Sequence, residues 1–214
     1  MNCFYALRPL ILASGSPRRR ELLASAGVAF QARPSPLEPE PLPGEAPAAY
    51  ARRAARSKAE AVLRLLEAEE QGAALLAADT IVTLDGRILG KPASPSQALE
   101  MLRFLAGRAH TVITACCLFP SGRASPAPVE FARKSRVSFW NPPPEALQVY
   151  AHGPDPLDKA GGYAAQGGGT MLVRSVSGSW SNVVGLPLSE TLEVLLANGI
   201  IAPSPAGAEG PCSG

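Results

Sequence analysis

The sequence has few of the residues on which common catalytic and metal-binding sites depend. Only two histidines and four cysteines occur in 214 residues, and no two cysteines have the C-x-x-C spacing of a zinc site. Cys116 and Cys117 are adjacent in a strand-like run, so their side chains are expected on opposite faces. A Cys/His zinc site is therefore disfavoured, and reduced thiols in a cytoplasmic protein are expected.

Charge and long apolar runs are also scarce. The net charge is only +2 and aromatic residues make up 6% of the chain, which disfavours a nucleic-acid partner. Apolar runs such as PLILA and VITACCLF are far shorter than the ~20 residues of a membrane span, so no membrane association is expected. The glycine-rich phosphate loops G-x-x-x-x-G-K-[ST] and G-x-G-x-x-G and the serine motif G-x-S-x-G are absent. Carboxylates and cations remain as the candidates for chemistry.

The pattern of the chain predicts an α/β fold with a mixed sheet. Asp85-Gly86 between apolar runs predicts a hairpin, and the proline-rich segment 34–47 a loop. The segment 203–214 is expected to be a disordered tail. The expected strands are 10–13, 73–79, 110–119, 129–140 and 170–176, and the expected helices are 17–27, 48–71, 96–105, a helix capped by Asn141 that runs to Tyr150, and 189–198. Because strands and helices alternate irregularly, a strict βαβ repeat is not expected.

The stretch LASGSPRRRELL, residues 12–23, suggests an anion site. Ser16 is a good N-cap and Pro17 suits the first helical position, yet Arg18–Arg20 follow in the first turn, where positive charge is unfavourable by a few tenths of a kcal/mol. Backbone N–H groups at a helix start bind phosphate, and arginine adds bidentate contacts. A plain capped helix explains the stretch of sequence equally well.

Other charged residues are ambiguous when taken singly. Asp79 ends an apolar run, where open α/β sheets bind ligands, but a turn beside Thr80 is an equal alternative. Lys58 lies in a basic helix whose charged side chains are expected to face solvent, and Glu38 is expected to be an exposed acid. Lys91 follows Gly90, and the pair Asp158-Lys159 fits a surface turn with a local ion pair.

Taken in order, five motifs resemble one family. LASGSPRRRELL, AADTIV, GKP, DKAGGYAAQG and NVVGLPL resemble the motifs of the Maf (septum-formation protein) nucleotide pyrophosphatases, from Leu10 to Asn198. The resemblance implies a domain over residues 1–202 with two lobes around a central cleft, similar to the inosine-triphosphate pyrophosphatase (Maf/Ham1-like) fold. It also implies hydrolysis of a nucleoside triphosphate to the monophosphate and pyrophosphate.

The resemblance assigns roles by position. Asp79 matches the proton acceptor, and Glu38 matches the first acid of a metal-binding acidic pair whose second acid is replaced here by Pro39. A divalent cation is expected with these carboxylates, Mg²⁺ first, with Mn²⁺ or Co²⁺ as alternatives. The residues implied in substrate binding are Ser14, Ser16, Arg18, Arg19, Lys58, Thr80, Lys91, Asp158, Lys159 and Gln166.

Three of these positions follow the branch that acts on dTTP and UTP. Arg18, Thr80 and Gln166 match that branch rather than the 7-methyl-GTP branch, and an amide suits the O4 and N3–H edge of uracil or thymine. A 7-methyl-GTP pyrophosphatase and a catalytically impaired nucleotide-binding accessory domain stay open as alternatives. The residues leave the oligomeric state open, although the resemblance suggests a homodimer.

Overall fold

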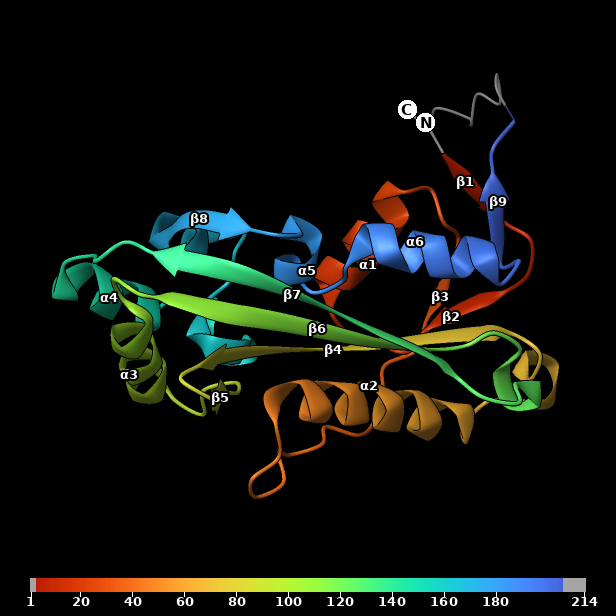
Figure 1. Ribbon diagram of the computed structural model, residues 1–214, viewed down its shortest axis with the longest axis horizontal. Coiled ribbons are helices and arrows are strands. Elements are labelled where there is room, and N and C mark those ends of the chain that lie inside the picture. The colour runs from red at the N-terminus through yellow and green to blue at the C-terminus, as the bar shows by residue number, and fades with distance from the viewer. Residues whose placement is uncertain (1–2, 206–214) are drawn as a thin grey trace.

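A twisted seven-stranded mixed sheet forms the centre of the molecule (Figure 1). The computed structural model describes residues 3–205. The strand order is β3 (Gln31–Ala32), β2 (Leu10–Leu12), β4 (Ala74–Leu84), β6 (Ala109–Phe119), β7 (Val129–Phe139) and β8 (Val173–Ser177), with β5 (Arg87–Leu89) paired to β4. The β3–β2–β4 pairs are parallel and the other pairs antiparallel, which confirms the predicted mixed α/β class.

Helices cover both faces of this sheet. α2 (Pro47–Leu63) packs on one face, where its small buried residues meet β4 and β6 (Figure 1). α1 (Pro17–Ser25) and α6 (Leu188–Ala197) pack on the other face at the same end of the sheet. α3 (Pro95–Leu105) and α4 (Pro144–Ala151) cover the far end. The short helix α5 (Trp180–Val184) lies against β6 and β7.

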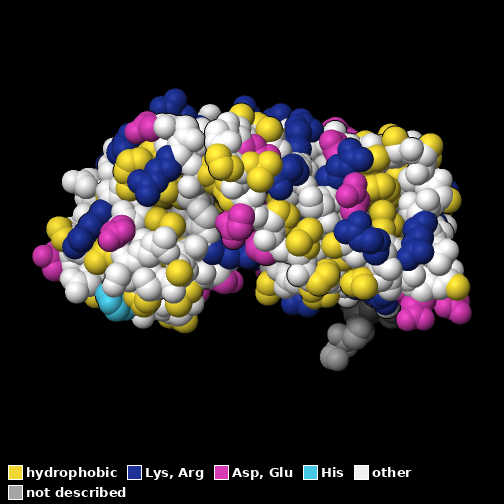
Figure 2. All heavy atoms as spheres, turned by 90° about the horizontal axis from the view of Figure 1, so that it is seen from below, with side chains coloured by type: hydrophobic (Ala, Val, Ile, Leu, Met, Phe, Trp, Pro, Cys, Tyr) yellow, Lys and Arg dark blue, Asp and Glu magenta, His cyan; other side chains and the backbone are white. Residues whose placement is uncertain are grey.

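The remaining elements are short. β1 (Phe4–Ala6) and β9 (Ile201–Pro203) form a separate antiparallel pair. The 3₁₀ turns are η1 (Ala68–Glu70), η2 (Gly122–Ala124), η3 (Pro156–Asp158), η4 (Ala160–Gly162) and η5 (Gly167–Leu172). Figure 2, seen from below Figure 1, shows a notch in the outline between a lobe that carries α3 and α4 and a lobe that carries α2. Within the described residues, no helix is both long and apolar enough to cross a membrane.

Two long elements end elsewhere than expected. The helix predicted to reach residue 71 ends at Leu63, because the side chain of Arg123 donates to the carbonyls of Leu63, Arg64 and Leu66 at and after the last helical residue. The strand predicted to end at Asp79 continues to Leu84, because β6 pairs with β4 from Leu75 to Thr83, including Asp79 opposite Ala115, and β5 pairs with its last residues. Asp79 is therefore a mid-strand residue.

Smaller differences have local causes. Asn141 does not cap α4; Pro143 is its N-cap, since consecutive prolines hold the preceding backbone extended. Residues 170–172 belong to η5, so β8 starts only at Val173. The hairpin at Asp85-Gly86 is confirmed, with φ of 53° and 75°. Of the predicted tail, Pro203 belongs to β9, and residues 206–214 lie outside the described residues.

Candidate active site

The cleft opens where one edge of β4 has no strand partner. β2 pairs with β4 only as far as Leu76, and β5 begins to pair at Val82. Asp79 and Thr80 lie in the gap and, because side chains alternate along a strand, point to opposite faces of the sheet. The cleft has a volume of about 720 Å³ and extends from the start of α1 to the β4–β5 hairpin and η4.

The turn before α1 forms one wall of this cleft. The hydroxyl of Ser14 is buried and accepts the backbone N–H of Ser16 at 3.2 Å. Ser16 occupies the predicted N-cap position, but its side chain makes no capping hydrogen bond, and the first turn of α1 contains no acid. Within the described residues, the backbone N–H groups of Arg18 and Arg19 are therefore without a side-chain acceptor, which favours an anion there.

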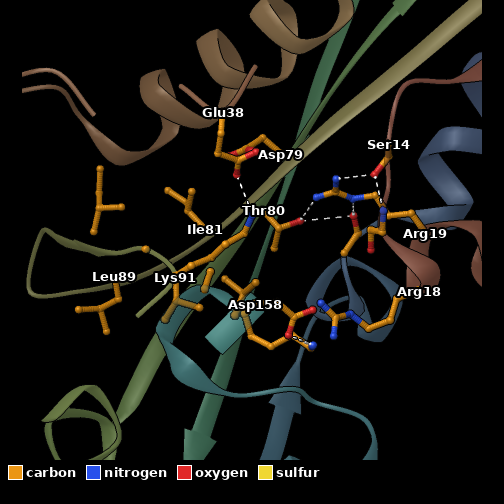
Figure 3. A pocket seen from close by; sticks show the side chains of 18 of the residues that line it. Ser14, Arg18, Arg19, Glu38, Asp79, Thr80, Ile81, Leu89, Lys91 and Asp158 are labelled. Atoms are coloured by element: carbon orange, nitrogen blue, oxygen red, sulfur yellow. Dashed lines mark hydrogen bonds and ion pairs between the residues drawn. The ribbon is translucent and has the colours of Figure 1, made fainter. Parts of the chain in front are cut away.

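The two arginines of the turn have different surroundings. Arg18 faces Asp158 across the cleft (Figure 3). Burial lowers the pKa of Arg18, and Asp158 and Asp155 oppose that shift without cancelling it. Arg19 instead donates to Gly185 O at 2.8 Å, Thr80 Oγ1 at 3.0 Å and Ser14 Oγ at 3.1 Å, and burial lowers its pKa as well. Three of its five N–H groups are thus used within the protein.

A chain of alternating charges occupies the middle of the cleft. Lys58 Nζ lies 2.6 Å from Asp79 Oδ1 and 2.9 Å from Glu38 Oε2, and Lys91 Nζ lies 2.9 Å from Glu38 Oε1. The side chains of Lys58 and Asp79 are only 9% and 8% exposed. Burial would raise the pKa of Glu38, but hydrogen bonds from Lys91 and Lys58 outweigh it and lower that pKa. The structure thus brings together four predicted site residues, from the loop before α2, from α2, from β4 and from the segment after β5. Figure 3 labels three of them, Glu38, Asp79 and Lys91.

These carboxylates suit a metal that arrives with phosphate ligands. The described residues contain no group of three or more His, Cys, Asp or Glu side chains able to hold a metal ion. Glu38 and Asp79 offer oxygen donors, and Asp79 Oδ2 makes no hydrogen bond within residues 3–205. A hard cation such as Mg²⁺ is commonly held by one or two carboxylates together with substrate phosphates, so the donor set fits such an ion.

The other end of the cleft is mainly apolar. Its lining residues there include Val82, Ile88, Leu89, Met101, Tyr163, Ala164 and Ala165. Glycine lets η4 pack closely against β4, since a Cβ at Gly161, where φ is +71°, would lie 3.1 Å from the side-chain carbons of Val82. Asp158 and Lys159 line the cleft and pair with each other, as predicted for that turn. Sequence reasoning missed Tyr163, although it lies inside the motif DKAGGYAAQG.

Gln166 does not line the cleft. It is exposed, and the chain turns away into η5 directly after Ala165. Two hydrogen bonds fix this path: Tyr150 Oη accepts Ala164 N–H at 3.1 Å, and Thr170 Oγ1 donates to Ala165 O at 3.0 Å. The expectation that this amide reads a pyrimidine edge therefore has no support in the geometry.

The fold and the cleft define an α/β protein with a preformed site for a polyanion, in which a helix start and basic side chains face two carboxylates. Comparison with known proteins identifies the family, because residues 9–198 match the family described as Maf-like protein. The chain belongs to the Maf family.

Similar proteins cover nearly the whole chain. A protein named dTTP/UTP pyrophosphatase from Nitratidesulfovibrio vulgaris is 49% identical over 92% of this chain and 91% of its own length. Proteins of the same name from Oleidesulfovibrio alaskensis and Anaeromyxobacter dehalogenans are 47% and 44% identical, over 95% and 91% of this chain and 91% and 96% of their own lengths.

Proposed function

We propose that the protein is a nucleoside triphosphate pyrophosphatase that hydrolyses dTTP and UTP to the monophosphate and pyrophosphate. The observation that carries the proposal is the Asp79–Lys58 pair in the cleft, next to the anion-binding start of α1. The substrates follow from the names of relatives that are 43–49% identical over about nine-tenths of the chain.

The cations hold the phosphates. Arg18 faces the cleft from the first turn of α1, and the N–H groups at that helix start add a positive end of the helix dipole. Lys91 and Lys159 approach from the other lobe. A triphosphate bound here would compete with Glu38 for Lys91. Lys91 would then stabilise the negative charge on the departing pyrophosphate.

Asp79 directs the attacking water. Lys58 holds one carboxylate oxygen at 2.6 Å, which fixes the side chain and leaves the second oxygen to accept a hydrogen bond from a water near the α-phosphorus. Pyrophosphatases of this family need a divalent cation, and we propose Mg²⁺ held by Glu38 and Asp79. Such an ion would neutralise phosphate oxygens when bound.

The apolar end of the cleft receives the base. Leu89, Met101 and Tyr163 offer the apolar surface that a flat pyrimidine ring covers. The preference for pyrimidines thus rests on Arg18, Thr80 and the relatives, without a role for Gln166.

We also propose the cytoplasm as the compartment, since Cys116 and Cys117 are buried free thiols. A homodimer stays a prediction, which light scattering after size exclusion checks.

Hydrolysis of a nucleotide panel with Mg²⁺, scored for pyrophosphate, tests the function. We expect kcat/KM for dTTP and UTP to exceed that for CTP and 7-methyl-GTP, and Asp79→Asn to lower kcat at least a hundredfold. Asp85→Asn is the matched control, because Asp85 is an exposed turn residue that, within residues 3–205, pairs only with Arg108. Absence of pyrophosphate release from any nucleotide would refute the proposal, and a higher kcat/KM for 7-methyl-GTP would replace its substrate.

A further inference from the structure

A buried hydrogen-bond chain reaches the phosphate turn from the middle of the sheet. It begins at Asn182 of α5, inside the motif NVVGLPL, and passes through Thr114 of β6 and Thr80 of β4 to Arg19. Asn182 and Thr114 are completely buried and do not line the cleft. The function proposed above uses neither of them.

The direction of each hydrogen bond follows from the number of protons available. Thr114 Oγ1 donates its one proton to Asn182 O at 2.9 Å. It therefore accepts the proton of Thr80 Oγ1, which lies 2.9 Å away, closer than the other acceptor of that proton, Gly185 O at 3.3 Å. Thr80 Oγ1 then has its lone pairs left and accepts Arg19 Nη2 at 3.0 Å. The chain orients the acceptor that Arg19 needs.

Asn182 is itself fixed at every polar atom. Its Oδ1 accepts Thr114 N–H at 3.1 Å, and its Nδ2 donates to Val112 O at 3.2 Å and to Ser135 Oγ at 2.9 Å. Such a fully satisfied buried network holds one geometry, because any displaced group would be left unpaired. α5 is thereby attached rigidly to β6 and β7.

The other end of the chain is the phosphate turn. Arg19 donates to Ser14 Oγ and to Gly185 O, and Gly185 ends α5 with φ of +132°. A Cβ at Gly185 would lie 3.7 Å from both Arg19 Nε and Thr80 Oγ1, so the backbone carbonyl comes close to the guanidinium (Figure 3 shows the Arg19 contacts with Ser14 and Thr80). Arg19 thus connects β4, α5 and the turn at Ser14.

We propose that Asn182, Thr114 and Thr80 are positioning residues that hold Arg19, and that Arg19 in turn fixes the turn at Ser14 relative to Asp79. The inference rests on the proposed pyrophosphatase function. Thr80 and Asp79 are adjacent on β4, so one strand sets both the phosphate turn and the carboxylate. A misplacement of about 1 Å between bound phosphate and catalytic group can lower a rate on the order of a hundredfold.

The test removes one hydroxyl. Thr114→Val leaves Thr80 without its acceptor, so that its proton turns toward Gly185 O, 3.3 Å away, which already accepts Arg19 Nε. We expect kcat for dTTP to fall at least tenfold with a smaller change in KM, and Thr114→Ser to restore it. Thr191→Val is the control, because Thr191 is equally buried and donates to Pro187 O outside the chain. It should lower the melting temperature like Thr114→Val without lowering kcat.

A second readout does not depend on turnover. The NMR signal of the Arg19 Nε–H, assigned by its loss in Arg19→Lys, should shift and exchange faster with water in Thr114→Val but not in Thr191→Val. Thr80→Val breaks the same link and replaces Thr114→Val if that variant does not fold. Unchanged kcat or an unchanged Arg19 signal overturns the inference. A parent protein that hydrolyses no nucleotide refutes the proposed function instead, and the Arg19 signal then decides the inference alone.

Discussion

The pair of Lys58 and Asp79 predicts a large coupling free energy. Two unit charges 2.6 Å apart attract by about 6 kcal/mol at an effective dielectric constant of about 20. Desolvation offsets part of this, at several kcal/mol per ion, since both side chains are more than nine-tenths buried. Glu38 adds little to the pair, because its side chain is 58% exposed. We expect a net coupling of about 2–4 kcal/mol.

A double-mutant cycle measures this coupling. Lys58→Met leaves the carboxylate of Asp79 buried without its partner and should lower the free energy of unfolding by about 3–5 kcal/mol. Asp79→Asn keeps a polar group beside Lys58 and should lower it by about 1–3 kcal/mol. The double variant should lose about 2–4 kcal/mol less than the two single losses combined, since neither charge is then left alone.

Urea unfolding at pH 7 and constant protein concentration gives the three differences. All three variants should be inactive on dTTP, including the double variant, whose loss of stability is smaller than the single losses combined; activity therefore does not follow stability. A coupling below about 0.5 kcal/mol, as found for exposed ion pairs, would show that the pair is not held as the structure has it.

Two further predictions concern stability. Burial lowers the pKa of His110 to about 4, so the unfolded chain binds the proton more tightly than the folded protein. The free energy of unfolding should therefore fall between about pH 6.5 and 4, by at most about 3 kcal/mol. Urea unfolding at pH 7, 5.5 and 4.5 should give a flatter pH profile for His110→Asn than for the parent, and equal profiles would contradict the assignment. A Cβ at Gly122, where φ is +54°, would lie 2.3 Å from Gln71 O, so Gly122→Ala should destabilise by more than about 2 kcal/mol. Gly44→Ala is the control, because Gly44 also has a positive φ of +73° but has open space around the added Cβ. It should lower the free energy of unfolding by about 1 kcal/mol in the same assay, and equal losses for the two variants would argue against the contact at Gly122.

Local patterns predicted the elements better than their ends. Alternation and turn residues located the long strands and the Asp85-Gly86 hairpin, because those signals lie within the segment itself. The end of α2 depends on Arg123, 60 residues further along the chain, and the length of β4 depends on its pairing with β6. Such contacts leave no trace in the segment they terminate.

The site shows the same division. Lys58 lies in the buried stripe of α2 that includes Ala51, Ala55 and Val62, yet its surrounding arginines favour a solvated face. Only the position of Asp79 on the sheet explains why a lysine is buried there. The motif resemblance selected Lys58 and Asp79 together, but it could not tell that Gln166 does not line the cleft, since that depends on the path of the backbone after Ala165.

The three longest strands extend through both lobes. β4, β6 and β7 each contain eleven residues, and the register between β4 and β6 is unbroken from Leu75 opposite Phe119 to Thr83 opposite Thr111. Neither lobe can therefore melt without breaking hydrogen bonds that the other lobe shares. Despite its two-lobed outline, the molecule should unfold in one cooperative transition, with the same midpoint for the fluorescence of Trp140 and Trp180 and for backbone circular dichroism.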